Sequence, residues 1–187
     1  MRHRKLIAGA AGVSVTAAVV AGGVGAAGAK PAAPAKVVVK QSAGMKMVPN
    51  RYIQDQMRFD RDVYTVRSGG TVEFRMTAPQ SGPHTLTVVA AKDLPRNAAQ
   101  AFNCKVCNKL GKAHGADPNS NAPPKFAYLE NGVGQNTPPK LDRPGDSVYL
   151  PPVKGSVVRF KVTAAKGTTL RFICLVHPWM QAKLVVR

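Results

Sequence analysis

The sequence predicts an all-β domain, an antiparallel sandwich or barrel of short strands. In several short segments apolar side chains alternate with polar ones, which is typical of strands with one buried face. Gly and Pro are frequent, at 17 and 15 of 187 residues, and Gly turns lead into strands that carry Phe. Hydrophobic residues make up 44% of the chain and the mean hydropathy is −0.13, which allows a core but excludes a protein with several membrane spans.

Residues 1–29 have the layout of a secretory signal peptide. A basic start is followed by an uncharged run rich in Ala and Val, and Ala27-Gly28-Ala29 has the form of a cleavage site. An uncleaved membrane anchor is the alternative, but the many Ala and Gly residues make the run weakly apolar and favour cleavage. We therefore expect a secreted protein in the periplasm, the cell wall or the medium, with no stable membrane span after cleavage.

Residues 30–47 contain two prolines, four lysines and many alanines, with no hydrophobic period. This composition predicts a flexible basic linker. The folded domain is expected over residues 48–187.

Within that domain five strands are predicted from alternation, each with a run of inward-facing apolar residues. Between about residues 94 and 146 the strand pattern lapses, and a long irregular insertion with a short helix over 98–110 is expected. A loop of this length inside a compact domain is usually functional or held by its own ties. The predicted strands cover residues 72–76, 84–88, 158–162, 170–174 and 184–186.

The strongest chemical signal is Cys174-Leu175-Val176-His177-Pro178-Trp179-Met180. Cys174 falls on the same strand face as Leu170 and Phe172, so its sulfur should point into the core, and Pro178 stops the strand. His84 falls on the inward face of an earlier strand and supplies a second imidazole. Thiolate, thioether and imidazole together suit copper, whereas a structural zinc site is disfavoured because Met is a poor zinc ligand. The alternative is that these side chains are only packed in a core.

These segments resemble the cupredoxin, or blue copper, family, and the short Cys174-x-x-His177-x-x-Met180 spacing is most like that of amicyanins. The resemblance covers about residues 48–87 and 147–187. It implies a Greek-key β-sandwich holding one type 1 copper ion, with His84, Cys174 and His177 as strong ligands and Met180 as the weak axial ligand. It also implies that Trp179 lies beside the exposed edge of the site, although Trp179 is equally well placed to plug the core.

The chain departs from the family pattern before the first histidine. Many members carry an Asn there that ties the two ligand loops together, whereas this chain has Thr77-Ala78-Pro79-Gln80-Ser81. The origin of that tie is therefore open.

A second candidate site is Cys104-Lys105-Val106-Cys107, with His114 seven residues later. Haem attachment is excluded because Asn108 stands where that motif requires His. A disulfide between Cys104 and Cys107 is favoured in an oxidising compartment, and a second metal site of Cys104, Cys107 and His114 is the alternative.

The histidine count limits the chemistry. Beyond the signal peptide the chain has only His84, His114 and His177, too few for a catalytic copper cluster besides the first site. The sequence therefore predicts no enzyme but a one-electron carrier between Cu(I) and Cu(II). A protein for copper storage or delivery and a copper-free adhesion module are the alternatives.

The charge points to the class of partner. Lys and Arg number 27 against 9 Asp and Glu, a formal charge of +18, and no acid precedes Asp55. An acidic redox protein or an anionic surface is the expected partner, unless the charge serves solubility alone. Nucleic acid is not expected, because the sequence shows no Arg-rich recognition helix and no interleaving of aromatic and basic residues. A monomer is expected.

Overall fold

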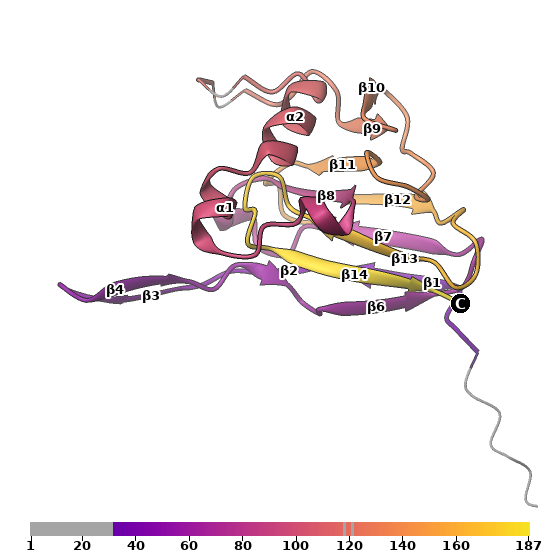
Figure 1. Ribbon diagram of the computed structural model, residues 1–187, viewed down its shortest axis with the longest axis horizontal. Coiled ribbons are helices and arrows are strands. Elements are labelled where there is room, and N and C mark those ends of the chain that lie inside the picture. Colours follow the sequence, from indigo (N-terminus) through magenta and orange to yellow (C-terminus); the bar gives the residue numbers. More distant parts are fainter. Residues whose placement is uncertain (1–31, 118, 121) are drawn as a thin grey trace, which may run out of the picture. The chain divides into compact units, whose positions relative to one another are not determined.

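Two β-sheets packed face to face form the body of the protein (Figure 1). The computed structural model describes residues 32–187 apart from 118 and 121, so the predicted signal peptide lies outside the described residues. One sheet has the order β1 (Lys36–Val39), β7 (Thr71–Arg75), β12 (Val157–Lys161). The other has the order β10 (Val133–Gln135), β9 (Tyr128–Glu130), β11 (Ser147–Leu150), β8 (His84–Val89), β13 (Thr169–Ile173), β14 (Gln181–Val186), β6 (Val63–Val66).

The order of the central strands makes the sandwich a Greek key. Strands β8 and β11 are antiparallel neighbours, β12 crosses to the other sheet, and β13 returns to pair with β8. A fourth strand that returns beside the first defines the Greek-key arrangement. The predicted all-β sandwich is confirmed, and four of the predicted strands lie within about two residues of β7, β8, β12 and β13, while β14 begins earlier than expected.

The expectation of a flexible linker over residues 30–47 is wrong from Lys36 onward. Strand β1 pairs in parallel with β7, and Val37 and Val39 are buried in the main core. The β-branched Val37-Val38-Val39 run favours a strand more strongly than the surrounding Pro and Ala disfavour it.

The core between the sheets is built around clustered aromatic rings. The rings of Phe59 and Phe172 meet edge to face with centroids 4.9 Å apart, and Tyr64 and Phe74 pack beside them. Phe59 belongs to the short ladder of β2 (Gln41–Ser42) and β5 (Arg58–Phe59). Alternation predicted the inward positions of Phe74 and Phe172, whereas Phe59 and Tyr64 lie outside the predicted strands.

Glu73 differs from the exposed position that alternation predicts. Its carboxylate is fully buried on the outer side of β7, where it pairs with Lys36, Arg75 and Arg159. The hydrogen bond from Arg75, followed by those from the other two cations, lowers the pKa of Glu73 to about 2 despite its burial. The carboxylate is therefore ionised and joins all three strands of this sheet.

The insertion is more regular than expected. It contains the 3₁₀ turn η2 (Ala91–Asp93), the helices α1 (Ala98–Phe102) and α2 (Lys105–Ala113), and the hairpin of β9 and β10. The single helix predicted over 98–110 is in fact two, because Cys104 has extended backbone and caps α2. A second, smaller core joins Cys104, Cys107 and Leu110 to Val89 and Ile173 of the large sheet, so the insertion covers the outer face of that sheet.

A separate hairpin of β3 (Met45–Val48) and β4 (Tyr52–Asp55) extends away from the sandwich (Figure 1). Met45, Met47 and Ile53 are each more than 60% exposed on it. In the part of the chain that the structure describes, no helix is long and apolar enough to cross a membrane.

Candidate metal centre

The candidate centre lies where two antiparallel neighbours of the large sheet meet at one end of the sandwich. Strand β8 begins with His84, and β13 ends one residue before Cys174. Because the two strands pair antiparallel, the start of one lies beside the end of the other. Residues 90 positions apart in sequence are therefore brought together.

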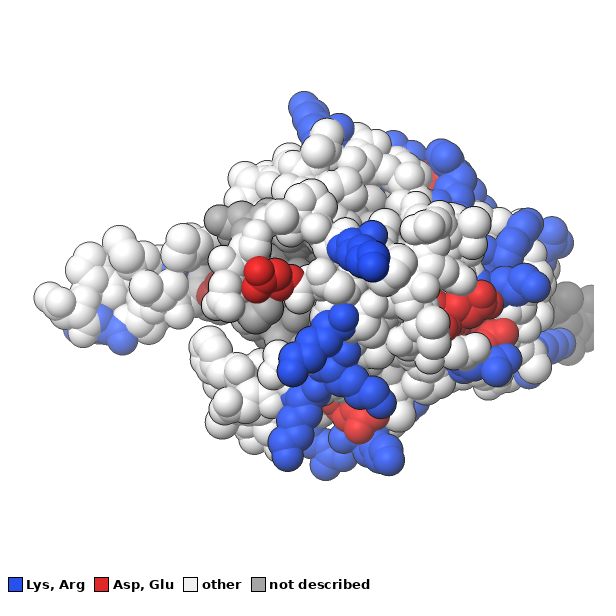
Figure 2. Space-filling view, turned by 90° about the horizontal axis from the view of Figure 1, so that it is seen from above, with Lys and Arg blue, Asp and Glu red and all other residues white. Residues whose placement is uncertain are grey.

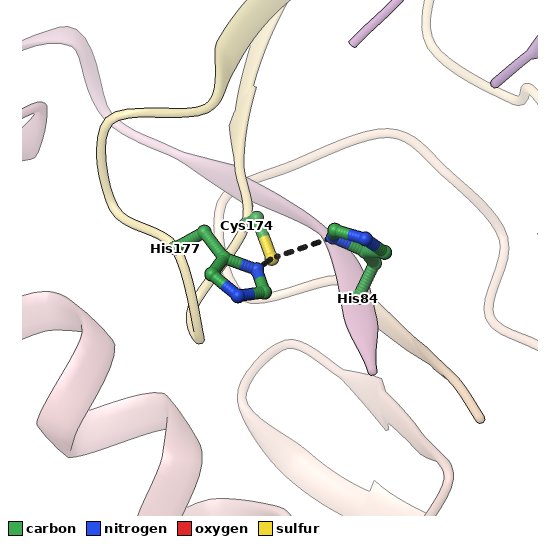
Figure 3. A group of neighbouring side chains, drawn as sticks. All are labelled: His84, Cys174 and His177. Atoms are coloured by element: carbon green, nitrogen blue, oxygen red, sulfur yellow. Dashed lines mark hydrogen bonds between the residues drawn. The ribbon is translucent and has the colours of Figure 1, made fainter. Parts of the chain in front are cut away.

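The donor atoms of His84, Cys174 and His177 all lie within 4.8 Å of one another (Figure 3). Cys174 Sγ is 3.8 Å from Nδ1 of His84 and 3.6 Å from Nδ1 of His177. Met180 is fully buried and belongs to the same core cluster as Cys174. All four residues predicted as ligands thus occur in one buried region.

The loop between Cys174 and Met180 is closed by its own backbone. The N–H of Cys174 donates to the carbonyl of Met180 at 3.0 Å, and the N–H of Met180 donates to the carbonyl of His177 at 2.8 Å. Pro178 lies within this turn, where its lack of an N–H costs no hydrogen bond. These bonds hold three of the four predicted ligands in one short, fixed turn.

A serine that the sequence reasoning missed orients His84. Ser81 Oγ lies 2.6 Å from the carbonyl of Ala78 and 2.8 Å from Nε2 of His84. The hydroxyl has one proton, and the carbonyl can only accept, so Ser81 donates to Ala78 and accepts from Nε2–H. The lone pair of His84 is then on Nδ1, the atom that faces Cys174 and His177.

Thr85 supplies a tie between the two ligand segments, where the family pattern would use an Asn. Its N–H donates to Cys174 Sγ at 3.3 Å, and its hydroxyl accepts from the N–H of Leu175 at 2.8 Å. Apart from the position of Thr85 next to His84, no pattern in the sequence indicates this role.

Burial sets the protonation of the donors. Burial raises the pKa of the Cys174 thiol, and this rise outweighs the opposing hydrogen bonds from Thr85 and the loop backbone. Burial lowers the pKa of His84 to about 4, with a smaller contribution from His177, whose own pKa burial also lowers. Both imidazoles are therefore neutral near pH 7, and metal binding must displace the thiol proton.

One edge of the centre faces solvent. His177 is 8% exposed whereas His84 is fully buried, and the ring of His177 packs edge-on against Trp179 with centroids 5.5 Å apart. Trp179 is 41% exposed and Val176 is 46% exposed. Trp179 therefore forms part of the rim beside His177 and does not plug the core.

The donor set fits copper. One thiol sulfur, two neutral imidazoles and a buried thioether sulfur combine the soft and intermediate ligands that copper takes in both oxidation states. The second candidate site does not assemble in the same way. Cys104 and Cys107 are joined by a disulfide, and His114 bonds instead to Phe126 and Ser147.

Comparisons with known proteins found distant structural likenesses. No family model and no curated protein matches the chain. Reduced auracyanin from Roseiflexus castenholzii is 17% identical over 83% of this chain and 99% of that chain, with a TM-score of 0.44. Auracyanin A, a "blue" copper protein from Chloroflexus aurantiacus, is 21% identical over 81% and 99%, with a TM-score of 0.39. The multicopper oxidase mgLAC is 15% identical over 81% of this chain but only 38% of that chain, with a TM-score of 0.35.

These similarities are too low to transfer a function. The assignment of a candidate copper centre therefore depends on the side chains themselves: a buried thiol held between two oriented imidazoles, with a buried methionine in the same closed loop.

Proposed function

We propose that this chain is a secreted type 1 blue copper protein that carries single electrons between partners. The observation that carries the proposal is the convergence of Cys174 Sγ with Nδ1 of His84 and of His177 beside the buried Met180. When bound, copper would supply one-electron exchange between Cu(I) and Cu(II). The short spacing of the loop supports an amicyanin-like variant of this site.

The protein supplies donor atoms that need not move when a bound copper ion changes between Cu(I) and Cu(II). The backbone bonds within the loop, the Ser81 hydroxyl behind His84 and the Thr85 tie fix the donor atoms before any metal arrives. A preorganised site keeps the energy of reorganisation small. Apolar side chains of the main core surround Cys174, so water is kept from the sulfur.

The exposed edge supports electron exchange by contact. His177 is the predicted ligand nearest to solvent, and Trp179 and Val176 form an apolar rim next to it. Lys and Arg side chains are spread over the face drawn in Figure 2, with smaller groups of acids between them. We infer that an acidic redox protein docks on this edge, steered by the formal charge of +15 that remains after residues 1–29 and their three basic side chains are removed (27 − 3 − 9).

The burial of the site favours electron transfer over storage or delivery of copper. Cys174, His84 and Met180 are fully buried, so an ion held by them would leave slowly, whereas a carrier of copper must release it. The same enclosure leaves no open position for a substrate, which supports a role other than catalysis.

The test is to load the purified chain with copper and cycle it between reduced and oxidised forms. A carrier of electrons should return the same visible band and copper content after each cycle and should lose copper slowly to a Cu(I) chelator. Rapid transfer of Cu(I) to the chelator during one cycle would instead support copper delivery.

A further inference from the structure

The hairpin of β3 and β4 sorts its side chains by chemistry onto two faces. Directly opposite residues of an antiparallel pair share a face, and Met45 lies opposite Asp55. Met47 lies opposite Ile53 in the same register. Successive residues of a strand alternate between faces, so Lys46, between the two methionines, belongs to the other face. One face therefore carries the thioethers, and the cation lies on the opposite one.

The contact that Lys46 makes agrees with this arrangement. Its Nζ lies 6.0 Å from the centroid of the Tyr52 ring, and Tyr52 pairs with Val48 on the second face. At this distance the ring attracts the ammonium group. The basic side chain is thus engaged on the side away from the methionines.

The face with the methionines borders a pocket at the base of the hairpin. Met45 and Met57 both line this pocket, which has a volume of about 340 Å³ and also reaches Asp55 and Ser81. Met57 packs against the main core, whereas Met45 is 70% exposed and Met47 is 64% exposed. An exposed side chain gains little hydrophobic stabilisation, so packing does not account for Met45 and Met47. We call Met45, Met47 and Met57 the methionine face.

The charge of the pocket suits a cation. Among the described residues that line it, only Asp55 is charged, although basic residues outnumber acidic ones by 27 to 9 in the chain. One carboxylate oxygen of Asp55 accepts from the N–H of Met57 at 2.7 Å. No ion pair to Asp55 occurs in the described part of the chain. A small cation in this pocket therefore meets thioethers and a negative charge that no basic side chain neutralises.

The donor atoms of the methionine face select monovalent copper. Thioether sulfur is a soft ligand that prefers Cu(I) to harder ions. Methionine is unbranched and has three rotatable bonds, so Met45 and Met57 can bring their sulfurs to one ion across the pocket, and Met47 can add a third. Divalent copper favours nitrogen and oxygen donors, so we do not expect these thioethers to retain Cu(II).

The pocket lies next to the candidate centre. Ser81, which lines the pocket, has its Oγ 2.8 Å from Nε2 of His84. His84, Cys174 and Met180 are fully buried, so an ion in solution has no direct contact with their donor atoms. A surface site that one side chain separates from His84 would hold the ion close to its destination.

We propose that the methionine face captures Cu(I) and passes it to the buried centre. Capture depends on the thioethers alone, whereas the transfer rests on the proposed copper centre. On transfer the ion exchanges thioether ligands for the Cys174 thiolate, the thiol proton is released to water, and no electron is gained or lost. The exposed methionines thus give a protein with an enclosed site a route for taking up its metal.

Silver(I) tests capture separately from the buried centre. It is soft and monovalent like Cu(I), and its binding can be followed by NMR of the methionine methyl groups. The experiment uses Cys174→Ser, which removes the thiolate ligand of the centre. The three methyl signals of the methionine face should shift together and saturate at one equivalent, whereas that of Met76, buried in the core, should not move. Unmoved signals, or a shift of only one of the three, would overturn the capture site.

Replacing two donors tests whether the sulfurs are responsible. In Met45→Leu with Met57→Leu the apolar bulk is kept, so the hairpin and the core should be preserved. Loss of a residue that only supports a metal ligand typically costs about tenfold in affinity, so loss of two ligands should weaken silver binding by at least that factor. Tyr52→Leu alters the opposite face of the same hairpin and should bind silver as the parent does. Equal affinity in both variants would overturn the proposal.

Copper uptake by the full chain tests the transfer. With Cu(I) supplied from a chelator and the product then oxidised, Met45→Leu with Met57→Leu should gain the visible band about tenfold more slowly or worse, yet reach the same final band and copper content. Tyr52→Leu should load at the wild-type rate. Equal loading rates would overturn the transfer step. A wild-type chain that binds silver at the methionine face but never forms the band would overturn both the copper centre and the transfer to it, and would leave capture supported.

Discussion

The two faces of strand β8 are both buried, but they are buried by different parts of the molecule. His84, Leu86 and Val88 face the main core, whereas on the other face Thr87 donates to Thr85 and also bonds to Ser147 beneath the insertion. The inner face carries a candidate copper ligand, and the outer face carries a polar chain that ends beside the ligand sulfur. One strand thus joins the centre to the insertion, and we expect changes on either face to be felt at the metal.

The cysteines show a similar contrast. Cys174 is a free, fully buried thiol between two imidazoles, whereas Cys104 and Cys107 are bonded to each other at the start of α2. Their different partners make the first a candidate metal ligand and give the pair a local structural role.

The largest effect is expected from Cys174→Ser. A serine hydroxyl is a hard and weakly acidic ligand that copper disfavours, so the variant should lose the intense visible band and most of its copper affinity. Absorption and metal analysis after copper loading measure both. Retention of the full band would remove Cys174 from the site.

The next largest effect concerns the stability of the metal-free protein in acid. The pKa of His84 falls from 6.5 to about 4 on folding, so the unfolded chain takes up a proton below pH 6.5 while the folded chain does not. The free energy of unfolding should therefore fall by about 3 kcal/mol as the pH drops from 6.5 to 4. His177 and His114, whose pKa values burial also lowers, act in the same direction.

Urea unfolding at a series of pH values measures this slope, and His84→Gln is the matched control. The slope should be shallower in that variant. Glu73 contributes at lower pH, because its pKa falls from 4.5 to about 2 and its stabilisation is lost only as the pH drops through that window. A wild-type curve that is flat between pH 6.5 and 4 would contradict the neutral, buried state of the imidazoles.

A smaller effect is expected from Met180→Leu. Leucine fills the buried space but has no thioether, so copper should remain bound while the reduction potential rises, because donation to oxidised copper is lost. Voltammetry of the two proteins compares the potentials. If the potential is the same, Met180 is only a core residue.

The smallest effect at the metal is expected from replacing both Cys104 and Cys107 by Ser. This disulfide closes a very short loop, so it constrains the unfolded chain only modestly. The visible band and the copper stoichiometry should match those of the wild type, while limited proteolysis should cut the insertion faster. A loss of bound metal in this variant would place a second metal at these cysteines.

The inner faces of the strands were predictable from the sequence, because Leu170, Phe172 and Cys174 follow a period of two and His84 begins a similar run. That periodicity predicted the sandwich and the inward positions of His84 and Cys174, whereas His177 and Met180 were found from the short motif that follows Cys174. It could not show which outer faces are covered, so Glu73, Thr85 and Thr87 looked like solvent-facing residues.

The remaining parts of the site depend on contacts between distant segments. Ser81 acts through a 3₁₀ turn, η1 (Pro79–Ser81), and His114 reaches Ser147 only because the insertion folds back over the sheet. Strand β1 was missed because its Val-rich run is short and lies among Pro, Lys and Ala, so the composition of the surroundings hid it.

The most direct test of the copper assignment is a titration of the metal-free chain with Cu(II), followed by visible absorption and metal analysis. We predict one copper ion per chain and an intense thiolate-to-copper band that grows in proportion and stops at one equivalent. Binding without that band, or no binding at all, would contradict a centre formed by His84, Cys174, His177 and Met180.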